Sequence, residues 1–154
     1  MKKKILIIIF ILLLFFILAN SLMNPVKSEK ESAIVLNLLS PVINAVWGEG
    51  AVSLPLLRKI AHFAEYTCLG LCLAIILGRK GKRKKPRALF DRAFGSLSIG
   101  LLVAVIDETI QNYSGRDSNL LDVWLDFSGV ITGVSIIILI LFVYNRRPTK
   151  YRRD

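Results

Sequence analysis

Residues 123–144 read VWLDFSGVITGVSIIILILFVY, and this stretch decides the class of the protein. It contains one charged residue, Asp126, in a run long enough to cross a bilayer, since a transmembrane helix needs about 20 predominantly apolar residues. Three further runs have the same character, namely Ile5–Leu22, Ile60–Leu77 and Ala93–Ile110. The sequence therefore predicts an all-α integral membrane protein with four transmembrane helices.

Composition and charge agree with this class. Hydrophobic residues make up 54% of the chain and the mean hydropathy is +0.57, which is too apolar for a soluble domain. The net charge of +10 comes from basic residues before the first run, between the second and third, and after the fourth. By the positive-inside rule, both termini are cytoplasmic in a multi-pass protein of the cell membrane.

The basic residues also predict the partners of the chain. On the cytoplasmic side they would attract anionic lipid head groups, at about 1 kcal/mol for each residue. No nucleic-acid partner is expected, because neither interleaved aromatic residues nor a groove-sized basic helix accompanies the charge.

The connection between the first two spans contains a second apolar segment, Ala33–Trp47, which is too short to span and holds Pro41. Its polar residues would form one stripe on a helix, which favours a helix lying in the outer membrane interface. A loop packed over the bundle is an equally good interpretation. The stripe consists of Asn37, Ser40 and Asn44.

The expected division of the chain follows from these segments. The first run is an N-terminal transmembrane anchor, with a cleaved signal peptide as the alternative because small residues occur at Ala19 to Ser21. The predicted parts are the anchor at 1–23, an extracytoplasmic loop with the interfacial segment at 24–57, a three-helix region at 58–144 and a basic cytoplasmic tail at 145–154.

Ionisable residues inside the apolar runs are the best indication of function, because each costs about 2.5–3.5 kcal/mol to insert. Helical spacing places them on one face of the second, third and fourth spans, together with the small residues Gly129 and Gly133, which suit close helix packing. We therefore expect one ligand-binding pocket near the outer end of the bundle. Its predicted residues are Arg58, His62, Glu65, Asp107, Glu108, Gln111, Arg116, Asp122 and Asp126.

Three interpretations of this cluster remain open: a structural polar network, a ligand site, and a catalytic or metal site. Candidate acid/base residues for an enzyme are His62, Glu65, Glu108 and Asp122. A hard divalent metal would be held by His62 and Glu65 with Asp122 and Asp126, but one histidine among carboxylates is a weak metal pattern. We therefore predict no cofactor.

The same residues resemble the two signatures of the VanZ-like family. Residues 58–66, RKIAHFAEY, followed by Leu69 and Gly70, resemble its first signature, RK-x-x-H-F-x-E-Y-x-x-L-G. Residues 107–111, DETIQ, then Gly115-Arg116, Asp122-Val123, Asp126 and the paired glycines resemble the second. The loop between Gln111 and Arg116 departs from the commoner family pattern, which carries an extra residue and often a proline.

This resemblance implies a small multi-helix bacterial membrane protein. The founding member of the family is associated with resistance to the glycopeptide antibiotic teicoplanin. We therefore expect a role in the cell envelope or in the response to glycopeptide antibiotics, with a surface or lipid-linked ligand in the pocket. Whether a reaction is catalysed is left open.

Overall fold

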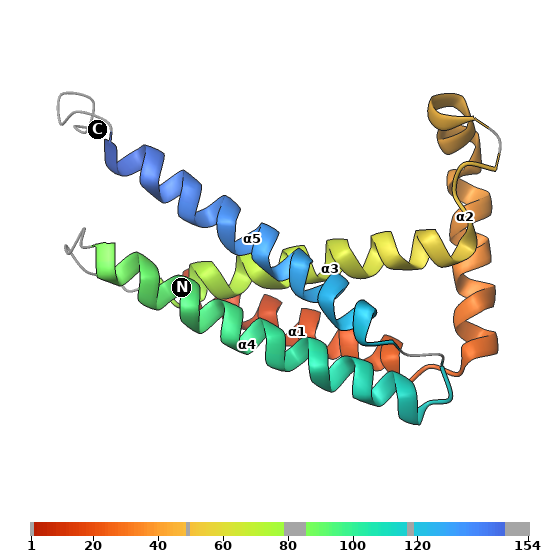
Figure 1. Cartoon of the computed structure of the whole chain (residues 1–154), viewed down its shortest axis with the longest axis horizontal. Helices are drawn as coiled ribbons and strands as arrows, with labels where there is room; N and C mark the ends of the chain where they lie inside the picture. Colours follow the sequence, from red (N-terminus) through yellow and green to blue (C-terminus); the bar gives the residue numbers. More distant parts are fainter. Residues whose placement is uncertain (1, 49, 79–85, 117–118, 147–154) are drawn as a thin grey trace.

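The computed structural model describes residues 2–48, 50–78, 86–116 and 119–146, and in these ranges all the regular secondary structure is helical (Figure 1). The structure contains the following helices: α1 (Lys2–Ser21), α2 (Pro25–Trp47), α3 (Leu54–Ile76), α4 (Pro86–Tyr113) and α5 (Leu120–Arg146).

Four of these helices are long and apolar enough to cross a membrane, which confirms the predicted fold class. The spans are Lys4–Ser21, Leu54–Ile76, Leu89–Tyr113 and Leu120–Tyr144. In Figure 1, α1 and α4 end where α3 and α5 begin, and we call this the pocket end of the bundle. Residues 79–85 of the basic connection between the second and third spans, and residues 147–154 of the predicted tail at 145–154, lie outside the described residues.

The closest packing in the bundle joins α5 to α3. A Cβ atom at Gly129 would lie 2.6 Å from the carbonyl oxygen of Phe63, and one at Gly133 would collide with the carbonyl oxygen of Thr67. The two backbones therefore touch, which confirms the predicted close-packing role of these glycines. Asp126 lies one turn before Gly129, and His62 directly precedes Phe63, so this contact brings the two side chains together.

The first helix is part of the bundle. α1 packs against α3 and α4, and two of its side chains, Ile17 and Ser21, are buried at 1% and 0% exposure. The end of the first run therefore lies beside α3 and α4, while its retention as an anchor stays a prediction.

The segment between the first two spans forms helix α2, which begins at Pro25 and keeps Pro41 in its interior. It runs across the direction of the other helices and packs against α3 (Figure 1). Apolar residues such as Ile34, Leu38 and Val42 are exposed along it. The interfacial helix and the segment packed over the bundle both stay predictions for this part of the chain.

Candidate functional site

A polar pocket with a volume of about 160 Å³ lies at the pocket end of the bundle. Every predicted site residue except Glu65 and Asp107 lines it. Its lining also includes three residues that the prediction left out. The full lining is Pro55, Arg58, Lys59, His62, Glu108, Gln111, Arg116, Asp122, Leu125 and Asp126.

Helix α3 supplies one wall of the pocket. Ser53 precedes the helix and Pro55 lies in its first turn, where a missing backbone N–H costs nothing. Arg58 and His62 follow one turn apart on the same face, so both reach the pocket. Glu65, the next residue on this face, lies about a turn deeper and does not line the pocket.

Asp107 on α4 lies behind the pocket and is fully buried. Its carboxylate accepts hydrogen bonds from the hydroxyl of Ser21 at the end of α1 and from Nε2 of Gln111, the latter at 3.0 Å. Tyr66, also fully buried, lies near the same carboxylate, but its hydroxyl has no hydrogen-bond partner among the described residues. Hydrogen bonds from α1 and from within α4 therefore hold Asp107 in place.

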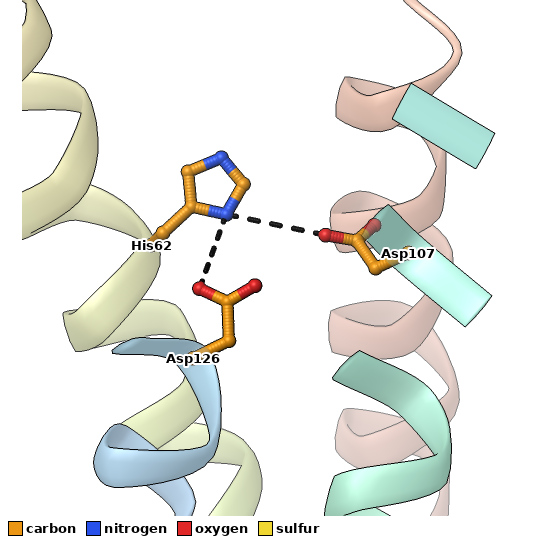
Figure 2. A group of neighbouring side chains, drawn as sticks. All are labelled: His62, Asp107 and Asp126. Atoms are coloured by element: carbon orange, nitrogen blue, oxygen red, sulfur yellow. Dashed lines mark ion pairs between the residues drawn. The ribbon is translucent and has the colours of Figure 1, made fainter. Parts of the chain in front are cut away.

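His62 faces two carboxylates from two other helices (Figure 2). Its Nδ1 atom lies 3.6 Å from Oδ1 of Asp126 on α5 and 4.0 Å from Oδ2 of Asp107. Both aspartates are almost completely buried, while the histidine side chain keeps 19% exposure toward the pocket. Three helices thus bring one imidazole and two carboxylates together at the pocket floor.

The turn after α4 directs Arg116 back toward the bundle. Gly115 has φ +75°, and the backbone N–H groups of Gly115 and Arg116 donate to the carbonyl oxygens of Asn112 and Gln111. This is a Schellman motif, which needs glycine because the left-handed conformation strains other residues. Nη1 of Arg116 then donates to the carbonyl oxygen of Asn20 at 3.1 Å, which joins the turn to the end of α1.

Arg116 is the pocket cation most removed from solvent, with 7% exposure. Burial lowers the pKa of its guanidinium and Arg58 acts in the same direction, whereas Asp107, Glu108 and Glu65 oppose the shift. An arginine side chain stays protonated in proteins, so a positive charge persists at this position.

The start of α5 is fixed by two polar contacts. Nζ of Lys59 lies 3.0 Å from Oδ1 of Asp122, in an ion pair whose side chains are 54% and 26% exposed. The backbone N–H of Asn119 donates to Oε1 of Glu108 at 3.0 Å. Glu108 and Asp122 therefore line the pocket and also hold α5 against α4 and α3.

A model of the protein family described as VanZ/LLP1 matches residues 6–142, which include every pocket residue. The chain belongs to the VanZ/LLP1 family. No curated protein and no solved structure matches it significantly.

Three contributors to this VanZ/LLP1 site were not among the predicted site residues: Ser21, Lys59 and the backbone carbonyl of Asn20. Lys59 had a usable signal, because it directly follows Arg58 at the mouth of a span. Ser21 had none, since an uncharged residue at the end of an apolar run carries no sign of which helix it will meet.

The arrangement separates two kinds of chemistry. The guanidinium groups of Arg58 and Arg116 line the pocket and suit an anion. The floor, with His62 and the buried carboxylates, suits a proton or a cation. A ligand could contact both regions if it placed an anionic group at the arginines and exchanged a proton, or shared a metal ion, with the floor.

Proposed function

We propose that this VanZ/LLP1 protein binds a phosphate-bearing, lipid-linked ligand of the cell envelope in its polar pocket, on the extracytoplasmic side of the cell membrane. Its physiological role would lie in the envelope or in the response to glycopeptide antibiotics. The orientation rests on the positive-inside rule applied to the basic segments.

The observation that carries the proposal is that the two pocket arginines have no carboxylate partner among the described residues. Among the described residues, neither Arg58 nor Arg116 forms an ion pair with a carboxylate within 4.0 Å. Arg116 bonds to a backbone carbonyl, and its buried Nε atom has no hydrogen-bond partner within the described part of the chain. Arginine presents a planar fork of donors that matches phosphate, and a buried unmade hydrogen bond is costly.

The size of the pocket limits the size of the group that it can bind. A volume of about 160 Å³ is well below the range of about 300–1,000 Å³ typical of pockets for drug-sized molecules. It suits a small head group such as a phosphate, with the rest of the ligand outside. A lipid-linked ligand meets this condition, because its chain stays in the bilayer beside the helices.

A second candidate function is supported by the His62 cluster. An imidazole placed 3.6 Å from a buried carboxylate is suited to proton transfer, so an intramembrane enzyme acting on a lipid-linked substrate is the alternative. A purely structural four-span protein is the third candidate, since buried polar networks also exist without chemistry.

The test compares Arg116→Gln with the wild-type protein in lipid nanodiscs that contain a polyprenyl phosphate. Loss of charge-assisted hydrogen bonds, worth about 1.5–3 kcal/mol, should weaken binding by about 10- to 100-fold, as measured by native mass spectrometry. Lys30→Ala is the control, because Lys30 is exposed on α2 away from the pocket lining.

Equal affinities in Arg116→Gln and wild type would refute the phosphate site. Deletion of the protein tests the physiological part separately. If deletion leaves susceptibility to glycopeptides unchanged, the resistance role is refuted while the ligand site is judged on the binding data alone.

A further inference from the structure

Three potential metal ligands converge at the pocket floor from three different helices. These are His62 of α3, Asp107 of α4 and Asp126 of α5, and one ligand atom from each lies within 4.8 Å of the others. Figure 2 shows the three side chains pointing toward one another. The α3–α5 backbone contact at Gly129 and Gly133 holds two of them, His62 and Asp126, close together.

The separations between these atoms do not suit direct hydrogen bonds. Nδ1 of His62 is 3.6 Å from Asp126 and 4.0 Å from Asp107, whereas N–H···O hydrogen bonds span about 2.7–3.2 Å. Metal–ligand bonds of about 2.0–2.2 Å instead place neighbouring ligand atoms about 3–4 Å apart. The two separations from Nδ1 of His62 therefore match those between neighbouring ligand atoms of one ion.

A second, independent observation concerns Asp126. This residue is 1% exposed, and its Oδ2 atom has no hydrogen-bond partner among the described residues. In Figure 2 the carboxylate points into the space between His62 and Asp107. A buried carboxylate oxygen without a donor requires an explanation, and a bound cation supplies one.

Charge balance favours the same conclusion. Within the described part of the chain, Asp107 and Asp126 have no lysine or arginine in an ion pair, and their shared partner is His62. Asp122, by contrast, is paired with Lys59 at 3.0 Å. One divalent cation would neutralise two buried carboxylates beside a neutral imidazole, which lowers the cost of holding them at this depth.

Asp107 also has the surroundings of a ligating carboxylate. Ser21 and Gln111 donate hydrogen bonds to its two oxygens and so fix its orientation. Such outer hydrogen bonds commonly orient the carboxylates that bind metals.

We propose that His62, Asp107 and Asp126 bind one divalent cation at the floor of the pocket. The mixed imidazole and carboxylate donors suit Zn²⁺ or Mn²⁺. This set replaces the combination considered from the sequence, because Glu65 is not in the cluster and Asp122 is engaged by Lys59. His62 and Asp126 line the pocket, so the remaining coordination positions face it and would accept water or a phosphate oxygen.

The proposal goes beyond the proposed function, because the cation is bound by the protein's own side chains without a phosphate ligand. The experiment therefore uses metal alone. Purified full-length protein in nanodiscs is stripped with a chelator, reloaded with Zn²⁺ or Mn²⁺, desalted and measured by elemental analysis. We expect about one ion per chain.

Matched isosteric variants identify the ligands. Asp126→Asn and Asp107→Asn should lose at least about 10-fold in metal affinity, in line with the loss of a charged ligand. Asp122→Asn removes a carboxylate from the same pocket but leaves the three ligands intact, so it should retain the wild-type stoichiometry. Thermal unfolding without metal confirms that each variant is folded.

A spectroscopic variant separates ligation from a structural role. In His62→Cys loaded with Co²⁺, a thiolate-to-cobalt charge-transfer band should appear in the near ultraviolet, and the wild type should lack it despite its Cys68 and Cys72. Absence of metal from the wild type, or equal metal content in wild type and Asp126→Asn, would overturn the proposal.

Discussion

Two of the hollows in the described part of the bundle have opposite character, and they place different demands on the groups that fill them. The polar pocket at the pocket end is small, at about 160 Å³. An apolar groove of about 720 Å³ lies between α4 and α5. It is lined mostly by aliphatic side chains such as Leu97, Val134 and Ile138. In Figure 1, α4 and α5 separate toward the end away from the pocket.

The two hollows have different requirements. Lipid chains are as apolar as leucine, so the groove can be filled by the bilayer without specific partners. Lipid chains cannot fill the pocket in this way, because every charged group in it needs a counter-charge or a hydrogen bond. The polar network across α1, α3, α4 and α5 meets much of this need, but buried polar atoms of Tyr66, Arg116 and Asp126 have no hydrogen-bond partner among the described residues. Those of Arg116 and Asp126 support the two proposals.

The largest effect should come from Gly133→Ala, which attacks the contact on which the pocket depends. The new Cβ would collide with the carbonyl of Thr67 and lie 2.7 Å from the backbone N of Leu71. Because backbone atoms cannot rotate away, we expect a loss of stability above the usual overpacking range of about 1–3 kcal/mol. The measurement is the thermal unfolding midpoint in detergent.

Gly95→Ala is the matched control for this prediction. Its Cβ would lie 3.4 Å from the flexible end of Leu77, an ordinary contact, so little change is expected. Equal destabilisation by the two substitutions would show that the α3–α5 contact does not govern the fold.

The next largest effect on the protein should come from a substitution that introduces a carboxylate into the groove. Val134 is 3% exposed and lies on α5 two helical turns beyond Asp126, in a lining without cations. Val134→Asp should therefore cost the full insertion penalty of about 2.5–3.5 kcal/mol, which lowers the amount of protein in the membrane. Abundance of Val134→Ala serves as the control for lost packing, and similar levels of the two variants would contradict the contrast between the hollows.

A smaller effect is expected from Ser21→Ala, which removes one donor from Asp107. Leaving a buried acceptor with one fewer donor costs about 1–3 kcal/mol. Ser98 on α4 is exposed, so Ser98→Ala should change the unfolding midpoint by far less. If both serines prove equally dispensable, the bond between α1 and Asp107 contributes nothing to the polar network.

Hydropathy predicted the four spans but not the ends of their helices. The second run begins at Ile60, whereas α3 begins at Leu54, and the third begins at Ala93, whereas α4 begins at Pro86. The difference has a physical cause, because hydrophobicity marks the hydrocarbon core while a helix continues into the polar interface. Residues such as Arg58 and Lys59 are helical there without being apolar.

Helical periodicity predicted much of the pocket lining, because it assigns residues on one helix to a common face. It could not predict which faces meet at a given depth. Glu65 shares the face of His62 yet lies outside the pocket lining. Asp107 and Gln111 are four residues apart and so share a face of α4, but the partner Ser21 could be found only once α1 and α4 were placed together. Ligand binding by the nine predicted residues stays a prediction.

The bonds from Ser21 to Asp107 and from Arg116 to Asn20 also bear on the biogenesis of the protein. They join the end of the first span to residues made 86 and 96 positions later. During synthesis the first helix cannot form these bonds until α4 and the turn after it have been made and inserted. A chain interrupted before that point would carry Arg58 and His62 on α3 without the carboxylates of α4 and α5, so the site is complete only when nearly the whole protein has been made.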